Sequence, residues 1–314
     1  MTLLVCGEAL YDIFQTGDDG AGALSFDARV GGSPFNVAIG IARLGGQASL
    51  LTGISTDALG GRLFERLKQE GVGTGYIIRS GRRTTLSLVG LDATGHPDYA
   101  FYGIGSADCA IAPDDMPDLP PDVEGLHLGS YSIAVAPVAD ALAGLIAANA
   151  ERFVSLDPNV RPTIEPDMGV WRSRIDALRR HSDLIKVSAE DLGMLFPGQA
   201  PADIAQDWLS GGATLVIVTD GGHAVRAYRD SGVVEVRPAP IKVIDTVGAG
   251  DSFQASLLAD LQARGPLSVT RGDLPDADLS AILADAARAA AVTCGRRGAD
   301  LPTLADRDSV IPVA

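Results

Sequence analysis

The sequence predicts an α/β fold in which helices pack on both faces of a mainly parallel sheet. Of its 314 residues, 46% are hydrophobic but only 5% are aromatic, so aliphatic side chains must build the core, as in helices packed on a parallel sheet. From residue 125 onward, strand-like and helix-like segments alternate, which predicts right-handed βαβ units. Two earlier segments alternate polar with apolar residues, which is typical of strands with one wet face. We therefore expect residues 1–314 to form one three-layer α/β/α domain with a small β-sheet lid.

The N-terminal elements include both lid segments. Leu3–Cys6 is a short apolar run, typical of a buried parallel strand. The lid segments span about 12–30 and 84–104, the second broken by a turn at Asp92 to His96, and we expect their strands to be antiparallel. Between them, Ser33 is the expected N-cap of a helix that has Pro34 at its first position and ends at Gly45 and Gly46.

The second half of the chain supplies the rest of the sheet. We expect residues 225–237 to form a hairpin of two strands, followed by a last strand, which leads into the segment from Ile244, and by two final helices. We expect strands at 126–128, 153–156, 184–187 and 215–218, and helices near 137–150, 171–180 and 189–196. Because strands alternate with helices here, ligands are expected at the carboxyl ends of the strands.

Charge and cysteine usage limit the location and the partners. A formal net charge of −15 argues against nucleic-acid or anionic-membrane partners. Cys6, Cys109 and Cys294 are odd in number and scattered, so we expect no disulfide framework and no Cys-based zinc site. Glu8 and Asp12 interrupt the first apolar stretch, so we expect no signal peptide here. We therefore expect a cytoplasmic protein.

The most informative segment runs from Ile244 to Phe253. The small residues at 248–250 let the backbone approach a ligand, and their N–H groups and the following helix start form an anion site. A carboxylate such as Asp251 would repel a phosphate bound in such a site. Its presence is explained if its role is to take a proton from an attacking hydroxyl. Three alternatives are a helix cap, a dinucleotide fingerprint and a Walker A loop. Phe253 occupies the position where a dinucleotide fingerprint needs a third small residue, and no Gly-Lys-Ser/Thr is present.

Two motifs, some two hundred residues apart, carry a family resemblance. Asp245 to Phe253 reads Asp-Thr-Val-Gly-Ala-Gly-Asp-Ser-Phe and resembles the C-terminal signature of the ribokinase-like (PfkB) sugar kinases. Gly31 to Gly46 resembles their N-terminal signature. The resemblance covers essentially the whole chain. It implies a ribokinase-like fold and transfer of the γ-phosphoryl group of ATP to a sugar hydroxyl.

The resemblance implies a role for each motif residue. Asp251 would be the general base, and the N–H groups of Gly248, Ala249 and Gly250 would hold the charge on the transferring phosphoryl group. Asp245 and the Val247 carbonyl match a site for a monovalent cation such as K⁺, although Asp245 could equally be a solvated strand-end residue. The residues matching the sugar-hydroxyl ligands are Asp12, Gly31, Gly32 and Asn36. Local capping by Asn36 and a plain strand-end acid at Asp12 are the alternatives.

The choice of sugar depends on two further segments. Asn159 and Arg161 belong to an Asp-x-Asn-x-Arg stretch that resembles fructokinases and 2-keto-3-deoxygluconate kinases. Phe101 begins a stretch that resembles the lid of bacterial fructokinases, although Gly103 stands where the pattern more often has Arg. The resemblance therefore favours fructose. A keto-acid substrate stays open because an arginine can bind a carboxylate through two hydrogen bonds.

The nucleotide side is expected on the other half of the sheet. The residues that match the family's nucleotide contacts are Lys186, Ser188, Thr219, Gly221, Gly222 and Gly298. Lys186 could also be a surface lysine. We expect Mg²⁺ to be held mainly by ATP and water, and no protein-bound zinc, because the four histidines show no ligand spacing. We also expect this chain to form a homodimer through the lid. A nucleotide- or sugar-binding regulator and a dehydrogenase are the alternatives of other classes.

Overall fold

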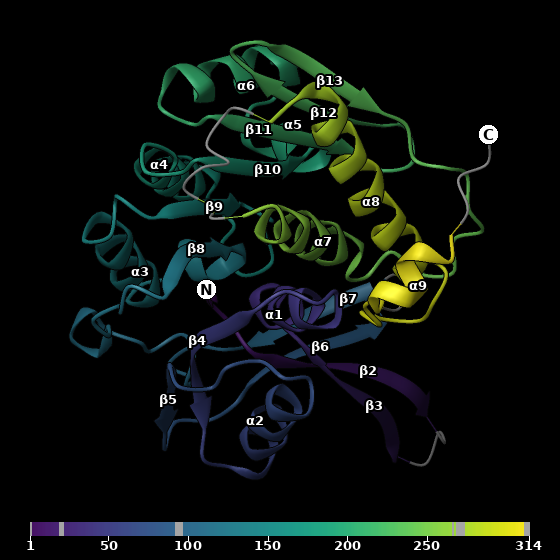
Figure 1. The fold of residues 1–314 in the computed structure, drawn as a ribbon. Helices are drawn as coiled ribbons and strands as arrows, with labels where there is room; N and C mark the ends of the chain where they lie inside the picture. Colours follow the sequence, from purple (N-terminus) through teal and green to yellow (C-terminus); the bar gives the residue numbers. More distant parts are fainter. Residues whose placement is uncertain (1, 19–21, 92–96, 266, 268–273, 311–314) are drawn as a thin grey trace.

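Two sheets of different size organise the computed structural model, which describes residues 2–18, 22–91, 97–265, 267 and 274–310. The larger has nine strands in the order β13-β12-β11-β10-β9-β8-β1-β4-β5 (Figure 1). Their bounds are β1 Thr2–Cys6, β4 Ala48–Ser55, β5 Ile77–Ser80, β8 Val123–Gly129, β9 Phe153–Asp157, β10 Leu184–Ser188, β11 Leu215–Asp220, β12 Ala224–Arg229 and β13 Gly232–Val236. All neighbours from β11 to β5 pair in parallel, whereas β12 and β13 are antiparallel. The expected hairpin at 225–237 is thus the antiparallel edge of the sheet.

Helices cover both faces of this sheet, as the composition predicts. One hydrophobic core gathers the buried side of α3 (Val138–Ala147), α4 (Met168–Arg179), α5 (Ala189–Leu195) and α6 (Pro201–Ser210). The other lies under α1 (Ser33–Arg43), α2 (Ala58–Gln69), α7 (Ala249–Ala263) and α8 (Asp276–Cys294). A short helix, α9 (Leu304–Asp308), packs on α8. None of the helices in the described part of the chain has both the length and the apolar character needed to cross a membrane.

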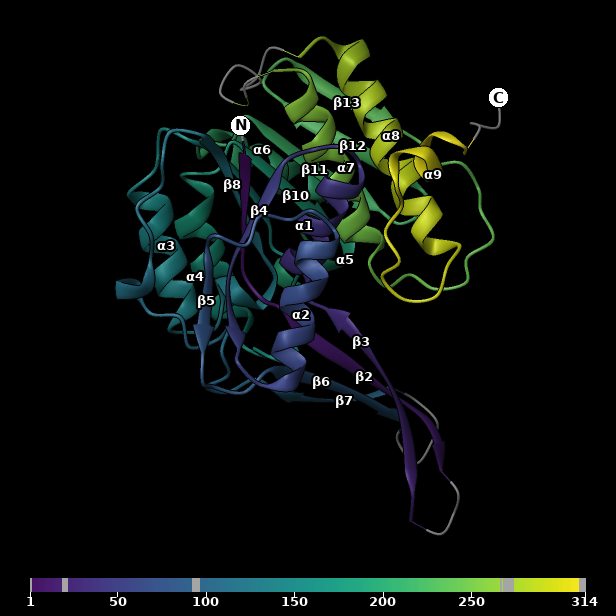
Figure 2. The same cartoon turned by 60° about the horizontal axis from the view of Figure 1, so that its bottom comes forward.

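The smaller sheet has the strand order β3-β2-β6-β7 and stands beside the carboxyl ends of the large sheet. Its strands are β2 (Leu10–Asp18), β3 (Leu24–Gly31), β6 (Thr85–Leu91) and β7 (Pro97–Tyr102). Figure 2 shows β2 and β3 extending away from the helical body. The two lid segments thus form one sheet, as expected, but the turn expected at Asp92 to His96 lies outside the described residues.

The expectation that all lid strands are antiparallel is wrong for the central pair. β2 pairs with β3, and β6 with β7, in antiparallel fashion, but β2 and β6 run parallel, with Leu10 opposite Thr85. Both strands leave the same carboxyl edge of the large sheet, after β1 and β5, so they enter the lid in the same direction.

Two further expectations fail around the glycine loop and α1. No strand precedes the loop: residues 237–248 are irregular, and the N–H groups of Ile244 and Asp245 donate to the Cys294 carbonyl at the end of α8. Ser33 is not the N-cap of α1, because the helix starts at Ser33 and Gly32 occupies the capping position without a side chain. The Ser33 hydroxyl is used in the site described below.

The helix after the glycine loop is more buried than its sequence pattern suggests. Phe253, Leu257, Leu258 and Leu261 are all buried, as expected for an apolar face. However, every residue from Asp251 to Ala259 is buried as well. α7 packs against both α1 and α8, so its first turn is held from two sides.

Candidate active site

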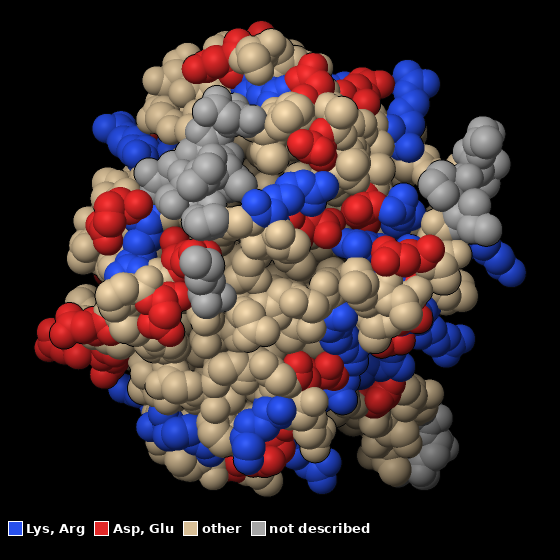
Figure 3. All heavy atoms as spheres, in the orientation of Figure 1, with Lys and Arg blue, Asp and Glu red and all other residues tan. Residues whose placement is uncertain are grey.

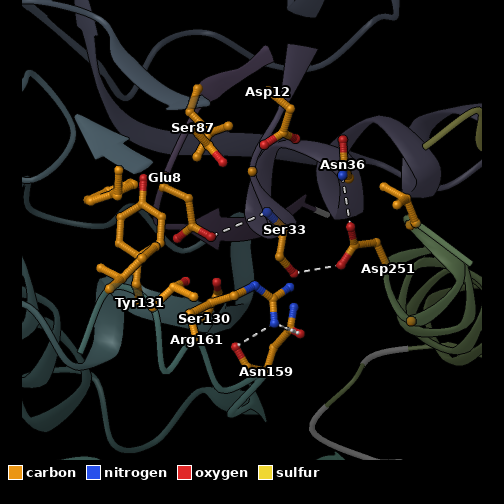
Figure 4. Close-up of a pocket in the computed structure, with 18 of the residues that line it drawn as sticks. Glu8, Asp12, Ser33, Asn36, Ser87, Ser130, Tyr131, Asn159, Arg161 and Asp251 are labelled. Carbon is orange, nitrogen blue, oxygen red and sulfur yellow. Dashed lines mark hydrogen bonds between the residues drawn. The ribbon is translucent and has the colours of Figure 1, made fainter. Parts of the chain in front are cut away.

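A cleft with a volume of about 610 Å³ lies between the small sheet and the carboxyl ends of β1, β8, β9 and β10 (Figure 4). The starts of α1 and α7 close it on the remaining side. Its polar and glycine lining consists of Glu8, Asp12, Gly32, Ser33, Asn36, Ser87, Ser130, Tyr131, Asn159, Arg161, Thr163, Glu190, Thr246, Gly248, Gly250 and Asp251. The apolar lining is Leu10, Phe14, Ala100, Phe101, Pro162, Ile164 and Val247. Parallel strands of an open α/β sheet generally present ligand sites at this edge.

Asp251 lies in the first turn of α7 and points at the start of α1. Its side chain is 7% exposed; Oδ1 accepts a hydrogen bond from the Ser33 hydroxyl at 2.7 Å, and Oδ2 accepts one from the Asn36 amide at 2.8 Å. Gly248 caps α7 with a φ of +79°, and a Cβ there would lie 2.6 Å from the Cβ of Ala299. The turn therefore needs glycine, and it places Gly248, Gly250 and the start of α7 at the cleft.

The residues expected to hold the sugar come together in this cleft. Arg161 Nη1 donates to Asn159 Oδ1 at 2.7 Å, and Asn159 has a φ of +42°. Burial raises the pKa of Asp12, and a hydrogen bond from Ser87 and the charge of Arg161 oppose that shift. A Cβ on Gly31 would lie 2.3 Å from Asp12 Oδ2, so Gly31 makes room for this carboxylate without lining the cleft itself.

An aromatic pair closes one side of the cleft. The rings of Phe101 and Tyr131 meet edge to face, with centroids 5.1 Å apart. The Tyr131 hydroxyl donates to the buried Asp108 carboxylate at 2.7 Å. Phe101, which the sequence singles out, is thus fixed by a neighbour from a different strand end.

The residues expected on the nucleotide side do not line this cleft. Ser188 and Thr219 lie opposite each other in the register of β10 and β11, and Gly221 and Gly222 follow β11 on the exposed surface. The Ser188 hydroxyl caps α5 by accepting the Asp191 N–H at 3.0 Å. Ser188 therefore has a structural role as a helix cap.

Lys186 is buried and is not a surface lysine. Its Nζ lies 2.8 Å from Asp157 Oδ2, and the two side chains are 5% and 1% exposed. Burial raises the pKa of Asp157 to about 6, against the lowering effect of Lys186. A Cβ on Gly250 would lie 3.3 Å from Nζ, so the ammonium group is next to the glycine loop.

Asp245 forms hydrogen bonds within its own loop and to the loop that contains Gly298. Its Oδ1 accepts the Val247 N–H at 3.1 Å, and its Oδ2 accepts the Gly298 N–H at 2.7 Å. Gly298, expected among the nucleotide contacts, is thereby anchored to the segment that leads into Gly248. Ala249, by contrast, starts α7 but does not line the cleft. Within the described residues, no group of three or more His, Cys, Asp and Glu side chains could hold a metal ion.

Several residues that line the cleft are not among the site residues predicted from the sequence. Glu8 is 1% exposed; its Oε1 accepts the Ser33 N–H at 3.3 Å, and its Oε2 accepts the Ser132 hydroxyl. Burial raises the pKa of Glu8 to about 7. Ser130 directly follows β8 and Glu8 lies two residues after β1, so their position at the strand ends was the available signal. Ser33 could not be found this way, because its partner Asp251 is 218 residues away.

The comparisons with known proteins agree with this architecture. A family model described as pfkB family carbohydrate kinase matches residues 2–306. A fructokinase of Rhizobium leguminosarum bv. trifolii is 38% identical over 262 residues, covering 83% of this chain and 79% of the relative. A fructokinase of Klebsiella pneumoniae is 33% identical over 304 residues, covering 93% and 91%. The crystal structure of a fructokinase with bound ATP from Xylella fastidiosa superposes with a TM-score of 0.89 at 29% identity, covering 98% of this chain and 97% of that chain. A matching family model over nearly the whole length, supported by these relatives, shows that the chain belongs to the pfkB family of carbohydrate kinases.

Proposed function

We propose that this carbohydrate kinase is an ATP-dependent fructokinase that converts fructose and ATP to fructose 6-phosphate and ADP. The observation that carries the proposal is the position of Asp251. Its buried carboxylate lies where the sugar-side cleft meets the glycine turn at the start of α7. A carboxylate at a helix start that otherwise attracts anions has a clear use as a base for the attacking hydroxyl.

The geometry supports an in-line transfer. The sugar hydroxyl oxygen forms a bond to the γ-phosphorus as the bond from that phosphorus to the β–γ bridging oxygen breaks, and ADP leaves. The hydroxyl proton passes to the Asp251 carboxylate. The N–H groups of Gly248, Ala249 and Gly250 would stabilise the charge on the transferring group; that of Ala249, which donates to the Thr246 carbonyl at 3.2 Å here, would have to turn toward it. When bound, Mg²⁺ would neutralise phosphate charge; the single carboxylates near the loop fit an ion that keeps most of its waters and is held by the nucleotide.

The charge of the cleft favours a neutral sugar. Four acidic side chains line it, and Arg161 is the one Lys or Arg among the described lining residues; the acids are Glu8, Asp12, Glu190 and Asp251. Carboxylates accept hydrogen bonds from sugar hydroxyls but repel a sugar acid. The relatives named above are fructokinases, which also favours fructose.

The nucleotide and cation sites are part of the proposal. ATP would extend from the glycine loop across the ends of β10 and β11, next to Lys186, Thr219, Gly221, Gly222 and Gly298. Asp245 and the Val247 carbonyl would be the place for K⁺. A monovalent cation there would share the Asp245 oxygens with the N–H groups of Val247 and Gly298.

Turnover of Asp251→Asn tests the role of the base. We expect sugar affinity and the melting temperature to stay near those of the wild type, and kcat to fall about 10²- to 10⁴-fold, the usual contribution of general-base catalysis. ADP release with fructose measures kcat, and calorimetry measures sugar binding. Asp260→Asn is a matched control, because it makes the same change on the same helix. The Asp260 carboxylate lies outside the cleft and pairs with Arg307 at 2.9 Å. A kcat for Asp251→Asn above a tenth of the wild-type value would remove Asp251 from the base role.

The choice of sugar is tested separately. ADP release is measured with fructose, ketodeoxygluconate, ribose, tagatose and nucleosides at matched concentrations. We expect the highest kcat/KM for fructose. A higher kcat/KM for any other sugar would replace fructose as the substrate while leaving the kinase assignment intact.

A further inference from the structure

The Glu8 carboxylate lies against the start of α1 (Figure 4). α1 has no side-chain cap, because Gly32 occupies the N-cap position, and Pro34 in its first turn has no N–H. The Ser33 N–H would therefore lack a partner within the helix. Glu8 Oε1 accepts it at 3.3 Å. A negative charge at this position also interacts favourably with the helix dipole.

Close backbone packing holds Glu8 in this place. Gly7 has a φ of +142°, and a Cβ there would lie 2.5 Å from the ring of Pro34. Gly32 has a φ of +104°, and a Cβ there would lie 2.7 Å from the Glu8 carbonyl oxygen. Only glycine allows this approach. The turn after β1 and the start of α1 are thus fitted to each other at two points, with Glu8 between them.

Ser33 connects Glu8 to Asp251. The main-chain N–H of Ser33 donates to Glu8, and its side-chain hydroxyl donates to Asp251 Oδ1 at 2.7 Å. On the other side, the Ser132 hydroxyl donates to Glu8 Oε2. A continuous path of hydrogen bonds therefore runs from Ser132 through Glu8 and Ser33 to Asp251.

We propose that Glu8 is a positioning residue for the phosphoryl transfer: its ionised carboxylate holds the first turn of α1 so that Ser33 and Asn36 orient Asp251. The inference rests on the proposed role of Asp251. Glu8 accepts hydrogen bonds at both oxygens, which the carboxylate does and the protonated acid does less well. Loss of its charge loosens the start of α1, and with it the two donors that orient Asp251.

Glu8 titrates in a range that makes this testable. Burial raises its pKa to about 7, while Ser132 and Ser130 oppose the shift through hydrogen bonds, and the charge of Asp108 adds to it. The titratable and charged groups that face it from neighbouring elements are Asp108, Cys109 and Tyr131, and the same cleft contains Asp12, Arg161, Glu190 and Asp251. Below about pH 7, Glu8 becomes protonated, so kcat falls on the acid side.

Glu8→Gln tests the proposal. Glutamine keeps an oxygen for the Ser33 N–H and an amide for Ser132, but it neither ionises nor titrates. We expect kcat at pH 8 to fall about fivefold, as for the loss of one charge-assisted hydrogen bond, with the sugar KM within about twofold. The acid limb of the kcat profile between about pH 6 and pH 8 should disappear. A wild-type kcat and an unchanged acid limb would overturn the inference.

A double-mutant cycle separates positioning from plain stability. If Glu8 acts partly through the Ser33 hydroxyl, Glu8→Gln should lower kcat by a smaller factor in a Ser33→Ala background than in the wild type, because only Asn36 then transmits its effect to Asp251; fully additive effects would count against the path. Ser132→Ala is a second probe, because removing a donor to the carboxylate raises its pKa and should shift the acid limb to higher pH. A limb that stays in place would contradict the proposal even if Glu8→Gln fails to fold. Asp108→Asn, at an equally buried acid without a bond to α1, should keep an acid limb but shift it to lower pH, because the charge of Asp108 that raises the pKa of Glu8 is removed. An inactive Asp251→Asn with a wild-type-like Glu8→Gln refutes this inference alone, whereas an active Asp251→Asn refutes the proposed function.

Discussion

The guanidinium of Arg161 contributes hydrogen bonds to the cleft in addition to its charge. Its Nη1 donates to Asn159 Oδ1 and to the carbonyl of Val160, which fixes the side chain at the end of β9. Among the described residues, its Nε and Nη2 donate to none, so they remain for a ligand. A neutral sugar would take single hydrogen bonds from them, whereas a sugar carboxylate would use both nitrogens at once.

Arg161→Lys should reduce kcat/KM for fructose about tenfold, which corresponds to one hydrogen bond of about 1.4 kcal/mol. Lysine keeps the positive charge but loses the planar set of donors. Steady-state ADP release with fructose and ketodeoxygluconate provides the measurement. Arg174→Lys, at a pair with Asp140 outside the cleft, is the matched control and should leave kcat/KM unchanged. If ketodeoxygluconate is used faster than fructose, and loses that advantage in Arg161→Lys, the substrate is the sugar acid.

At the scale of the elements, the site depends on where two helices begin. α1 and α7 pack against each other, and both start at the cleft. The small sheet covers the opposite side with one face of β2, β6 and β7. Because the sheet joins the body through only a few chain crossings, we infer that it moves as a lid over the sugar.

Hydrogen exchange measures this movement. With saturating fructose and a non-hydrolysable ATP analogue, amides in β2, β3, β6 and β7 should exchange more slowly, because lid closure excludes water. Amides in β8 and β9, buried in the large sheet, serve as the internal reference. Unchanged exchange in all four lid strands would show that the small sheet does not close.

The sequence predicts most elements but misses those that depend on distant partners. The βαβ alternation, the helix at Ser33 and the hairpin at 225–237 are found because their signals are local periodicity and turn residues. The strand expected before the glycine loop is absent; Val243 and Ile244 are each 56% exposed, so these apolar residues do not enter the core. Ser33 looks like an N-cap in sequence, but the fold brings Asp251 to its hydroxyl.

The same limit applies to the candidate site. The sugar and base residues of the two motifs converge in one cleft because both motifs start helices that pack together. Glu8 and Ser130 lie outside the two signature motifs, and the order of the strands places them beside these motifs. Lys186 resembles a surface residue in sequence, yet the fold buries it against Asp157.

At the scale of the whole molecule, the protein carries a net charge of −15, and its nucleotide substrate is also negatively charged. On the face shown in Figure 3, acidic and basic side chains are interspersed around a largely uncharged centre, so the excess charge is not gathered in one patch there. Binding of a nucleotide must therefore rely on close-range donors, since the long-range field is repulsive.

Ionic strength should affect the two substrates differently. Raising it from about 10 to about 150 mM shortens the Debye length and screens the repulsion of MgATP. We expect kcat/KM for MgATP to rise severalfold, while kcat/KM for the uncharged fructose stays constant. Kinetics in a salt series at fixed free Mg²⁺ tests this. A fall in kcat/KM for MgATP with salt would mean that local cations such as Lys186 dominate the encounter.

The two hydrogen bonds to Asp251 also bear on how ATP is protected when no sugar is bound. A base with both oxygens open could activate any water that enters and waste the nucleotide by hydrolysis. Here each oxygen already accepts a hydrogen bond, from Ser33 at 2.7 Å and from Asn36 at 2.8 Å. A lone water would have to compete with these tethered donors at a buried carboxylate, whereas a polyol brings several hydroxyls that can bond to Ser33, Asn36 and Asp251 together. The arrangement without sugar thus favours phosphoryl transfer to a sugar hydroxyl over hydrolysis of ATP by water.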